Sequence, residues 1–371
     1  MKIAIVHDYL NQYGGAERVL EVFHRLFPQA PIFTLVYDKK VLPQYHDWDI
    51  RPSFLQRVPF ARRRYRNFMF LFPLAMRLLK LKEFDVVFTI THAWGKGVKL
   101  RRTSCHICFC LTPIRYFWDL YEDYKNFRYL NPLLRMALPL FVRPIRGWDV
   151  RSAQRVDHFV AISKVVSERI KKFYDRDSTV IYPSVDTSFF KPSGQKSGDY
   201  FLTVSRLKEY KRIDIIIEAF NYLGLPLKII GTGELMERLK RIARDNIEFV
   251  GSVSDNRLLS YYQSCRALVF AGYEDFGLVP LEAQACAKPV IAFAKGGLLE
   301  TVVEGETGVF FKEQTPSSLI EAIKGFEKVN FDPKRIRDNA LRFDRRIFEE
   351  KIKGYIDERF VEYKEGGMLR S

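Results

Sequence analysis

Residues 266–293 read RALVFAGYEDFGLVPLEAQACAKPVIAF. Two apolar runs in this stretch, Ala267–Ala271 and Val290–Phe293, are short and bounded by Gly or Pro, which is typical of buried strands. Between them, Leu281–Ala287 has the apolar spacing of a helix. The order strand, helix, strand predicts two parallel strands joined by a crossover helix.

The same alternation runs along the rest of the chain. Stretches with helical spacing, such as Ala16–Leu26, Lys164–Phe173 and Ile213–Leu223, separate short strand-like runs. We therefore predict an α/β protein with two Rossmann-like, doubly wound parallel sheets. The strand-like runs are Ile3–His7, Ile32–Tyr37, Asp85–Ile90, His106–Leu111, His158–Ile162 and Val180–Tyr182 in the first half, and Tyr200–Val204, Leu227–Gly231, Ile247–Val250, Ala267–Ala271, Val290–Phe293 and Gly308–Phe311 in the second.

A Pro-, Ser- and Gly-rich interval at Tyr182–Asp199 separates the two sets of strands. It predicts a first domain over residues 1–185 and a second that begins at residue 186. Two such domains are expected to face a central cleft, and open α/β sheets bind ligands beyond the carboxyl ends of their strands. We therefore look for function in the turns that follow strands.

Composition restricts the class of protein. Of the 371 residues, 47% are hydrophobic and 28% are charged, which excludes a disordered or low-complexity chain. No run approaches the roughly 20 apolar residues of a membrane-spanning helix, and residues 1–10 lack the pattern of a secretory signal. The five cysteines are expected to be reduced, and no second ligand pair accompanies Cys105 and Cys108, so we predict a cytoplasmic protein without a structural metal.

Positive charge is concentrated in the first half. The net charge is +16, of which residues 1–186 carry an excess of 14 and residues 187–371 an excess of two. Residues 54–82 hold eight basic side chains, six aromatic ones and no acidic one. This mixture predicts peripheral binding to an anionic membrane surface, with a solvated basic face as the alternative. Nucleic acid is not expected as a partner, because no known binding motif accompanies the charge.

One candidate turn follows the first strand. Gly14 and Gly15 open a helix there, and the absence of side chains lets a phosphate approach the backbone amides. The pattern is neither that of a dinucleotide-binding loop nor that of a P-loop, which argues against a nicotinamide enzyme and a nucleoside triphosphatase.

Two more turns lie in the second half. Arg206 and Lys211 follow the strand Tyr200–Val204 and offer a fork-shaped and a compact cation to a diphosphate, with a solvated loop as the alternative. In a later turn, main-chain groups at Gly251 and Val253 could line a base or ribose pocket.

The turn after Ala267–Ala271 carries two carboxylates eight positions apart. Glu274 lies in the loop and Glu282 inside the following helix, so one can meet sugar hydroxyls while the other takes a ribose diol. The amides of Gly277, Leu278 and Val279 begin that helix and suit phosphate. The alternative for both acids is an ordinary surface position.

Taken together, the Glu-x7-Glu pattern of Glu274 and Glu282, the Arg-x4-Lys of Arg206 and Lys211, and the Gly14-Gly15 turn resemble the retaining glycosyltransferases of family 4, which have the GT-B fold. The resemblance covers essentially the whole chain. The stretches 91–97 (THAWGKG) and 111–119 (LTPIRYFWD) are most similar to bacterial polysaccharide mannosyltransferases. The usual pattern of the second stretch begins His-Thr-Pro, but position 111 is Leu, so no acceptor role is assigned there.

The resemblance implies a role for each of these residues. Arg206 and Lys211 would hold the donor diphosphate, Gly14 and Gly15 would close over it, Glu282 would bind the ribose and Glu274 the sugar. It places His92 and Arg115 on the acceptor side. It also implies that the last helices, around Phe343–Phe360, return to the first domain, which would then include about 345–371 and leave 186–344 to the second.

The expected reaction is the transfer of a hexose, most simply mannose from GDP-mannose, to a polyprenyl-linked or polysaccharide acceptor such as an O-antigen or lipopolysaccharide glycan. Arg206, Lys211 and the helix start at Gly277 would neutralise the leaving diphosphate without a metal cofactor, and the leaving phosphate itself is the best candidate for removing the acceptor proton. His92 is a second candidate for that step. The alternatives are another GT-B sugar enzyme, such as an epimerase, a phosphorylase or a UDP-sugar transferase, and a noncatalytic basic protein that binds membranes or nucleic acid.

Overall fold

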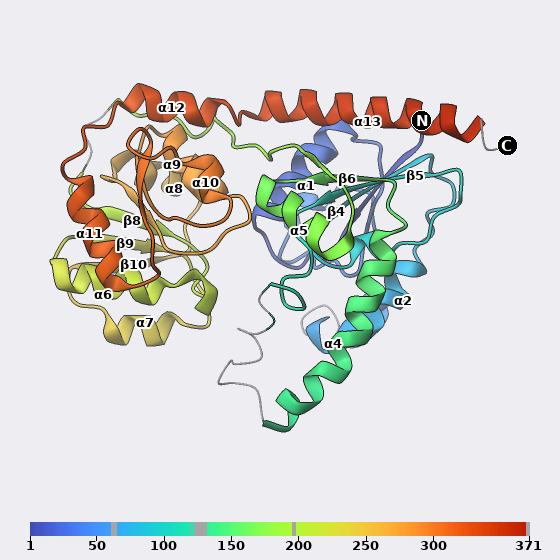
Figure 1. The fold of residues 1–371 in the computed structure, drawn as a ribbon, viewed down its shortest axis with the longest axis horizontal. Coiled ribbons are helices and arrows are strands. Elements are labelled where there is room, and N and C mark those ends of the chain that lie inside the picture. The colour runs from blue at the N-terminus through green and yellow to red at the C-terminus, as the bar shows by residue number, and fades with distance from the viewer. Residues whose placement is uncertain (61–64, 120, 122–131, 195–197, 369–371) are drawn as a thin grey trace. The chain divides into compact units, whose positions relative to one another are not determined.

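The structure, a computed structural model, describes residues 1–60, 65–119, 121, 132–194 and 198–368 (Figure 1). The chain forms two compact units. The first comprises Met1–Ile181 together with the chain from Glu349 onward, and the second comprises Tyr182–Phe348. These bounds lie within four residues of the predicted ones at 185 and 344.

The first unit is built on a seven-stranded sheet in the order β3-β2-β1-β4-β5-β6-β7, with every pair parallel. Its central strands β4 and β5 are buried along their whole length, as expected for strands covered on both faces. The strands are β1 (Ile3–His7), β2 (Ile32–Thr34), β3 (Ile50–Pro52), β4 (Val86–Thr91), β5 (Cys105–Cys110), β6 (His158–Ala161) and β7 (Thr179–Val180).

Strand β3 was not predicted. It has only three residues and ends in Pro52, which has no N–H for a sheet hydrogen bond. Such a strand is tolerated at the sheet edge, where the sheet order places β3.

Helices surround this sheet on both faces. Phe72, Met76 and Trp94 pack with Val6 and Val87 of the sheet in one apolar cluster. Helix α4 was not predicted as a helix, because its Arg-rich sequence indicated only a basic stretch. The helices are α1 (Gly15–Leu26), α2 (Phe72–Arg77), α4 (Pro132–Ala153), α5 (Lys164–Tyr174) and α13 (Arg345–Met368), with short 3-10 turns η1 (Pro43–Tyr45), η2 (Phe54–Arg57), η3 (Tyr65–Leu71) and η4 (Gly95–Gly97).

The C-terminal part of α13 belongs to the first unit. The Tyr363 hydroxyl donates a hydrogen bond to the carbonyl of Arg102, 261 positions earlier. Among the described residues, no helix has the length and apolar character needed to cross a bilayer.

The second unit holds a six-stranded parallel sheet in the order β10-β9-β8-β11-β12-β13. Ile216 and Phe220 of α6 pack against Phe201, Ile229 and Val269 of the sheet. The strands are β8 (Phe201–Val204), β9 (Leu227–Ile230), β10 (Ile247–Gly251), β11 (Leu268–Phe270), β12 (Val290–Phe293) and β13 (Gly308–Phe311). The helices are η5 (Glu209–Lys211), α6 (Ile213–Leu223), α7 (Met236–Ile242), α8 (Asp255–Ser264), α9 (Leu278–Ala285), α10 (Leu298–Thr301), α11 (Pro316–Phe326) and α12 (Pro333–Leu341).

Both sheets follow the same topology. In each, three strands run in one direction across the sheet and the chain then returns to continue on the other side of the first strand. This is the strand order of doubly wound, dinucleotide-binding folds, so the predicted fold class is confirmed.

Candidate functional site

The sheet order identifies one place in each unit where a ligand site is expected. It reverses between β1 and β4 in the first unit, and between β8 and β11 in the second. Loops that leave the carboxyl ends of strands at such a reversal diverge and leave room for a ligand. The predicted residues Gly14, Lys211 and Glu274 all follow one of these strands.

Lys211 and Glu274 form an ion pair although 63 positions separate them in the sequence. Lys211 ends η5 after β8, and Glu274 lies in the loop after β11. Their side chains are only 12% and 23% exposed. The Lys211 ammonium also lies 5.1 Å from the ring centre of Tyr210 and 5.7 Å from that of Phe270, where the negative faces of the rings favour a cation.

Arg206 contacts the hydroxyl of the same tyrosine. Its side chain is exposed, and Nη2 donates a hydrogen bond to the Tyr210 hydroxyl over 3.3 Å. Arg206 and Lys211 therefore both contact Tyr210, and the loop after β8 presents two cations next to a carboxylate.

Close backbone contacts shape this loop. A side chain on Gly231, which has a φ of +134°, would place its Cβ 1.9 Å from the Ser205 carbonyl oxygen. A Cβ on Gly233 would lie 2.3 Å from the Leu207 carbonyl. The loop after β9 therefore supports the loop that carries Arg206, and it can do so only with glycine at both positions.

A second pair of glycines supports Glu274, and sequence analysis missed it. The Gly297 amide donates to the Glu274 carbonyl over 2.9 Å, and a Cβ on Gly296 would lie 2.4 Å from that same oxygen. The Gly296-Gly297 pair could have been recognised in the sequence, because two consecutive glycines shortly after a strand, here β12, indicate that another backbone segment approaches closely.

The other predicted donor residues lie around α9 and β10. Gly277 immediately precedes α9 with a φ of +107°, and no side chain caps the amides of the first turn, which includes Leu278 and Val279. Gly251 ends β10 with a φ of +79°, and Val253 follows in the adjoining loop.

Glu282 does not lie on the surface. It lies inside α9 with 4% of its area exposed, and Oε2 accepts a hydrogen bond from the Tyr262 hydroxyl over 2.8 Å. A surface role for this acid is therefore excluded, and its role toward a ribose stays a prediction.

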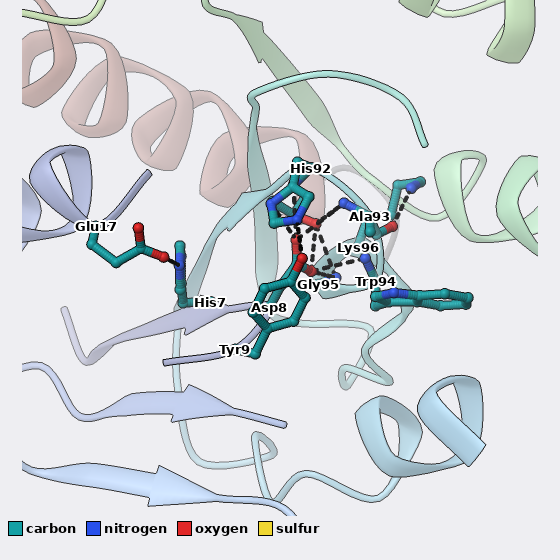
Figure 2. Close-up of polar contacts among 10 residues, drawn as sticks. His7, Asp8, Tyr9, Glu17, His92, Ala93, Trp94, Gly95 and Lys96 are labelled. Carbon is teal, nitrogen blue, oxygen red and sulfur yellow. Dashed lines mark hydrogen bonds and ion pairs between the residues drawn. The ribbon is translucent and has the colours of Figure 1, made fainter. Parts of the chain in front are cut away.

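In the first unit, the turn after β4 wraps around a buried carboxylate (Figure 2). Asp8 follows β1 and is fully buried. Its oxygens accept the Thr91 hydroxyl at 2.8 Å and four consecutive backbone amides, those of residues 92–95, at 2.7–3.0 Å. Burial raises the pKa of Asp8, but the charges of His92 and His7 and these hydrogen bonds outweigh it, so the pKa lies below its usual value.

His92 is oriented by two partners. Its Nδ1 lies 3.1 Å from Asp8 Oδ2, and its Nε2 lies 2.6 Å from the Tyr9 hydroxyl (Figure 2). The side chain is 22% exposed, whereas Asp8 is not exposed at all. The predicted acceptor-side residue is therefore a histidine held between a carboxylate and a phenol.

Two further buried pairs flank this turn. His7 Nε2 lies 3.4 Å from Glu17 Oε1 of α1 (Figure 2), and Lys96 Nζ lies 2.5 Å from Asp149 Oδ1 of α4. All four side chains are at most 1% exposed. Neither pair was predicted from the sequence, because the partners are 10 and 53 positions apart and come together only in the folded chain.

The structure shows no distinctive geometry at the other predicted residues of the first unit, Gly14, Gly15 and Arg115. Gly14 precedes α1 with a φ of −170°, an extended conformation that any residue adopts, so its backbone geometry does not require glycine there. Gly15 is the first residue of α1. Arg115 lies in the turn after β5, half-buried, and its carbonyl accepts the Trp118 amide.

Carboxylates in the form of an Asp-x-Asp triplet occur twice, at 47–49 and 175–177. Both triplets lie on the surface. Arg51 binds both oxygens of Asp49, and Lys171 pairs with both acids of the second triplet. In the described ranges, no three His, Cys, Asp or Glu side chains gather as metal ligands, and all five cysteines are buried thiols.

Two family models match the chain, one for each half. Residues 13–189 match Glycosyltransferase Family 4, and residues 184–343 match Glycosyl transferases group 1. The chain belongs to the family-4-like glycosyltransferases of GT-B fold.

Relatives of this GT-B glycosyltransferase cover part of its length. An uncharacterized glycosyltransferase of Methanocaldococcus jannaschii, MJ1178, is 29% identical over 53% of this chain and 56% of its own. The human α-1,3/1,6-mannosyltransferase ALG2 is 27% identical over 44% of this chain and 47% of its own, and the D-rhamnosyltransferase WbpZ of Pseudomonas aeruginosa is 26% identical over 52% and 53%. The matched region thus spans about half of these relatives.

Solved structures show the same fold at low identity. Anabaena HepE in complex with UDP and glucose has a TM-score of 0.70 at 18% identity, covering 96% of this chain and 99% of its own. Sucrose-phosphate synthase of Thermosynechococcus elongatus has a TM-score of 0.74 at 16% identity, covering 98% and 100%.

Proposed function

We propose that this GT-B glycosyltransferase is a retaining hexosyltransferase that uses a nucleoside diphosphate sugar. The observation that carries the proposal is the Lys211–Glu274 pair, with Arg206 beside it, at the strand-order reversal of the second unit. Binding of a diphosphate requires cations, and binding of a sugar requires a group that accepts hydrogen bonds from its hydroxyls. The loops after β8 and β11 supply both kinds of group side by side.

In the proposed reaction, the bond between the anomeric carbon and the diphosphate oxygen breaks, and positive charge develops on the sugar ring while negative charge develops on the diphosphate. Arg206, Lys211 and the amides at the start of α9 stabilise the leaving group. Glu274 accepts hydrogen bonds from the sugar. Catalysis is then mainly electrostatic, and we propose that it requires no metal cofactor.

For the donor, we propose GDP-mannose. The mannosyl and D-rhamnosyl activities in the names of ALG2 and WbpZ support a mannose-like hexose. The UDP in the HepE complexes favours the competing choice of a UDP-sugar. For the acceptor, we propose a polyprenyl-linked glycan of the lipopolysaccharide or O-antigen class.

The test is calorimetry and turnover with GDP-mannose and UDP-glucose. Arg206→Ala and Lys211→Ala should each reduce turnover by more than about 100-fold, because each removes a charged contact that strengthens as the leaving group forms. Lys228→Ala is the matched control, since Lys228 pairs with Glu248 on neighbouring strands of the same unit. Turnover near the wild-type level in both Arg206→Ala and Lys211→Ala would contradict the proposal. Release of nucleoside diphosphate only in the presence of an acceptor would separate transfer from epimerisation.

We further propose that the first unit binds the inner face of the cytoplasmic membrane. Phe70, Leu74 and Leu78, spaced four apart along η3 and α2, are 72%, 48% and 59% exposed. The opposite side of the same segment, including Phe72 and Met76, is buried in the core. An exposed apolar stripe beside cationic groups suits insertion at a lipid surface.

Three arginines of the first unit, one of them in α2, lie close enough to one another to concentrate positive charge. Partial burial lowers the pKa of Arg155, and the positive charges of Arg77 in α2 and Arg151 in α4 lower it further. In the described part of the chain, no carboxylate forms an ion pair with any of the three. The predicted basic residues Arg62, Arg63 and Arg64 lie outside the described residues.

Vesicle sedimentation tests the membrane proposal. Each basic residue near an anionic surface contributes about 1 kcal/mol, so the protein should sediment with phosphatidylglycerol-containing vesicles and not with pure phosphatidylcholine. The double variant Leu74→Ser/Leu78→Ser should lose binding, whereas Leu299→Ser, which changes a 55% exposed leucine of the second unit, should not. Equal binding by both variants would leave this surface as a solvated basic face.

A further inference from the structure

A third loop of the second unit is held against the loop that carries Glu274. It follows β12, which lies next to β11 on the side away from β8. The Gly297 amide donates to the Glu274 carbonyl, and a Cβ on Gly296 would lie 2.4 Å from that oxygen. A Cβ on Gly297 would lie 2.4 Å from the Cα of Phe276. The residue before this glycine pair, Lys295, therefore has a backbone position that is fixed relative to Glu274.

Lys295 is an exposed cation in this loop. Its ammonium lies 5.2 Å from the ring centre of Tyr273, the residue that precedes Glu274, and the face of the ring favours a cation. In the part of the chain that the structure describes, no carboxylate forms an ion pair with Lys295. An ammonium has three N–H donors, so Lys295 keeps donors for a ligand while the ring holds it beside the loop of Glu274.

Charges alternate along the carboxyl ends of three neighbouring strands. The sheet order β8-β11-β12 places Lys211 first, Glu274 second and Lys295 third. In the proposed donor complex, Arg206 and Lys211 bind the diphosphate and Glu274 binds the hexose. Lys295 then lies on the side of the hexose that faces away from the diphosphate, where O4 and O6 are the oxygens remote from the anomeric carbon.

The two side chains that meet the hexose have opposite hydrogen-bonding roles. An ionised carboxylate such as Glu274 only accepts hydrogen bonds, and an ammonium such as Lys295 only donates them. A hexose bound by both groups has its orientation fixed, because an acceptor and a donor must each find a suitable hydroxyl.

We propose that Lys295 is a specificity-determining residue that donates a hydrogen bond to O4 or O6 of the transferred hexose. The inference rests on the proposed function and deepens it. The contact exists only when the sugar is present, because a nucleoside diphosphate ends at the phosphate that Arg206 and Lys211 bind. Lys295 therefore contributes to the affinity for a nucleotide sugar and not to the affinity for the nucleotide alone.

The first experiment is calorimetric titration of GDP, GDP-mannose, UDP and UDP-glucose into the wild type and Lys295→Met. A hydrogen bond from a charged group contributes a factor of about 10 to 150, so Lys295→Met should raise the Kd for the nucleotide sugar at least about 10-fold. The Kd for the free nucleotide should change by less than about twofold. Lys295→Arg keeps a cation that can lie over the Tyr273 ring and should restore binding of the nucleotide sugar at least in part.

The second experiment uses the charge of the sugar as a probe of where the ammonium lies. UDP-glucuronic acid has a carboxylate at C6 where UDP-glucose has a hydroxymethyl group, and GDP-mannuronic acid and GDP-mannose differ in the same way. The pair is chosen to match the base that the wild type binds. An ammonium binds a carboxylate about twice as strongly as a hydroxyl, so Lys295→Met should weaken binding of the acidic sugar more than that of the neutral one. An unchanged ratio of the two Kd values would place Lys295 away from this end of the sugar and overturn the proposal.

Lys328→Met is the matched control. Lys328 is also exposed, and it follows Glu327, which pairs with Arg266 just before β11 begins, at the opposite edge of the sheet. This variant should change none of the Kd values. If the wild type binds a nucleotide sugar and Lys295→Met binds it equally well, or loses the free nucleotide to the same extent, the role of Lys295 is wrong and the proposed function stands. If the wild type binds neither nucleotide nor nucleotide sugar, the proposed function fails, and the role of Lys295 fails with it.

Discussion

Glu274→Gln is expected to have opposite effects on two ligands of the second unit. The substitution keeps the size of the side chain and removes the negative charge that pairs with Lys211. Lys211 is then free to turn fully toward a diphosphate, so a nucleoside diphosphate should bind more tightly. A nucleotide sugar should lose that advantage, because the carboxylate that we propose accepts hydrogen bonds from the sugar is gone.

The structure sets the magnitude. An exposed ion pair contributes up to about 1 kcal/mol, and this pair, at 12% and 23% exposure, lies at or above that limit. Removing the competing carboxylate should therefore lower the Kd for GDP by a factor of about five. Lys211→Met removes a hydrogen bond to a charged group, about 1.5–3 kcal/mol, and should raise the Kd about 10- to 150-fold.

The assay is calorimetric titration of GDP into the wild type, the two single variants and the double variant, repeated with UDP. Glu274→Gln should have no effect on the Kd in the Lys211→Met background, since the ammonium that it frees is absent. Weaker GDP binding by Glu274→Gln, or equal tightening in both backgrounds, would refute the reasoning. Lys228→Met provides the control for loss of a lysine from an ion pair elsewhere in the unit.

Three further outcomes follow from buried groups. Glu282→Gln keeps an oxygen that can accept the hydrogen bond of the Tyr262 hydroxyl, so its melting temperature should stay within a few degrees of the wild-type value. Calorimetry should nevertheless show weaker binding of both GDP and GDP-mannose. Unchanged affinity for both ligands would show that Glu282 is not part of the binding site. Gly97→Ala would place a Cβ 2.2 Å from the ring of Trp148, so denaturant unfolding should show a loss of about 1–3 kcal/mol, and a loss near zero would show that the ring moves freely. Burial lowers the pKa of His106 to about 3, below its value of 6.5 in the unfolded chain. Between these two pH values only the unfolded state binds a proton at this histidine, so the free energy of unfolding should fall by up to about 1.4 kcal/mol per pH unit as the pH drops from 6.5 toward 3. This pH dependence, measured by denaturant unfolding, should be weaker in His106→Gln.

The sequence alone determined the class of fold and the turns that carry the candidate site. Short apolar runs such as Ile3–His7 and Val290–Phe293 are strands in the structure because a parallel sheet buries both faces, and that requirement is visible as an uninterrupted apolar run. Glu274 and Glu282 were found because a strand-to-helix turn has a local signature. Short edge strand β3 and Arg-rich helix α4 have no such signature, and both were missed.

Tertiary structure decided which of these turns meet. Lys211 and Glu274 are 63 positions apart, and they touch because β8 lies next to β11 in the sheet while β9 and β10 lie on its other side. Asp8 and His92 are 84 positions apart and meet for the same reason, since β1 pairs with β4. Strand order depends on the packing of whole helices against both faces of a sheet, a long-range property that the spacing of residues within one turn does not contain.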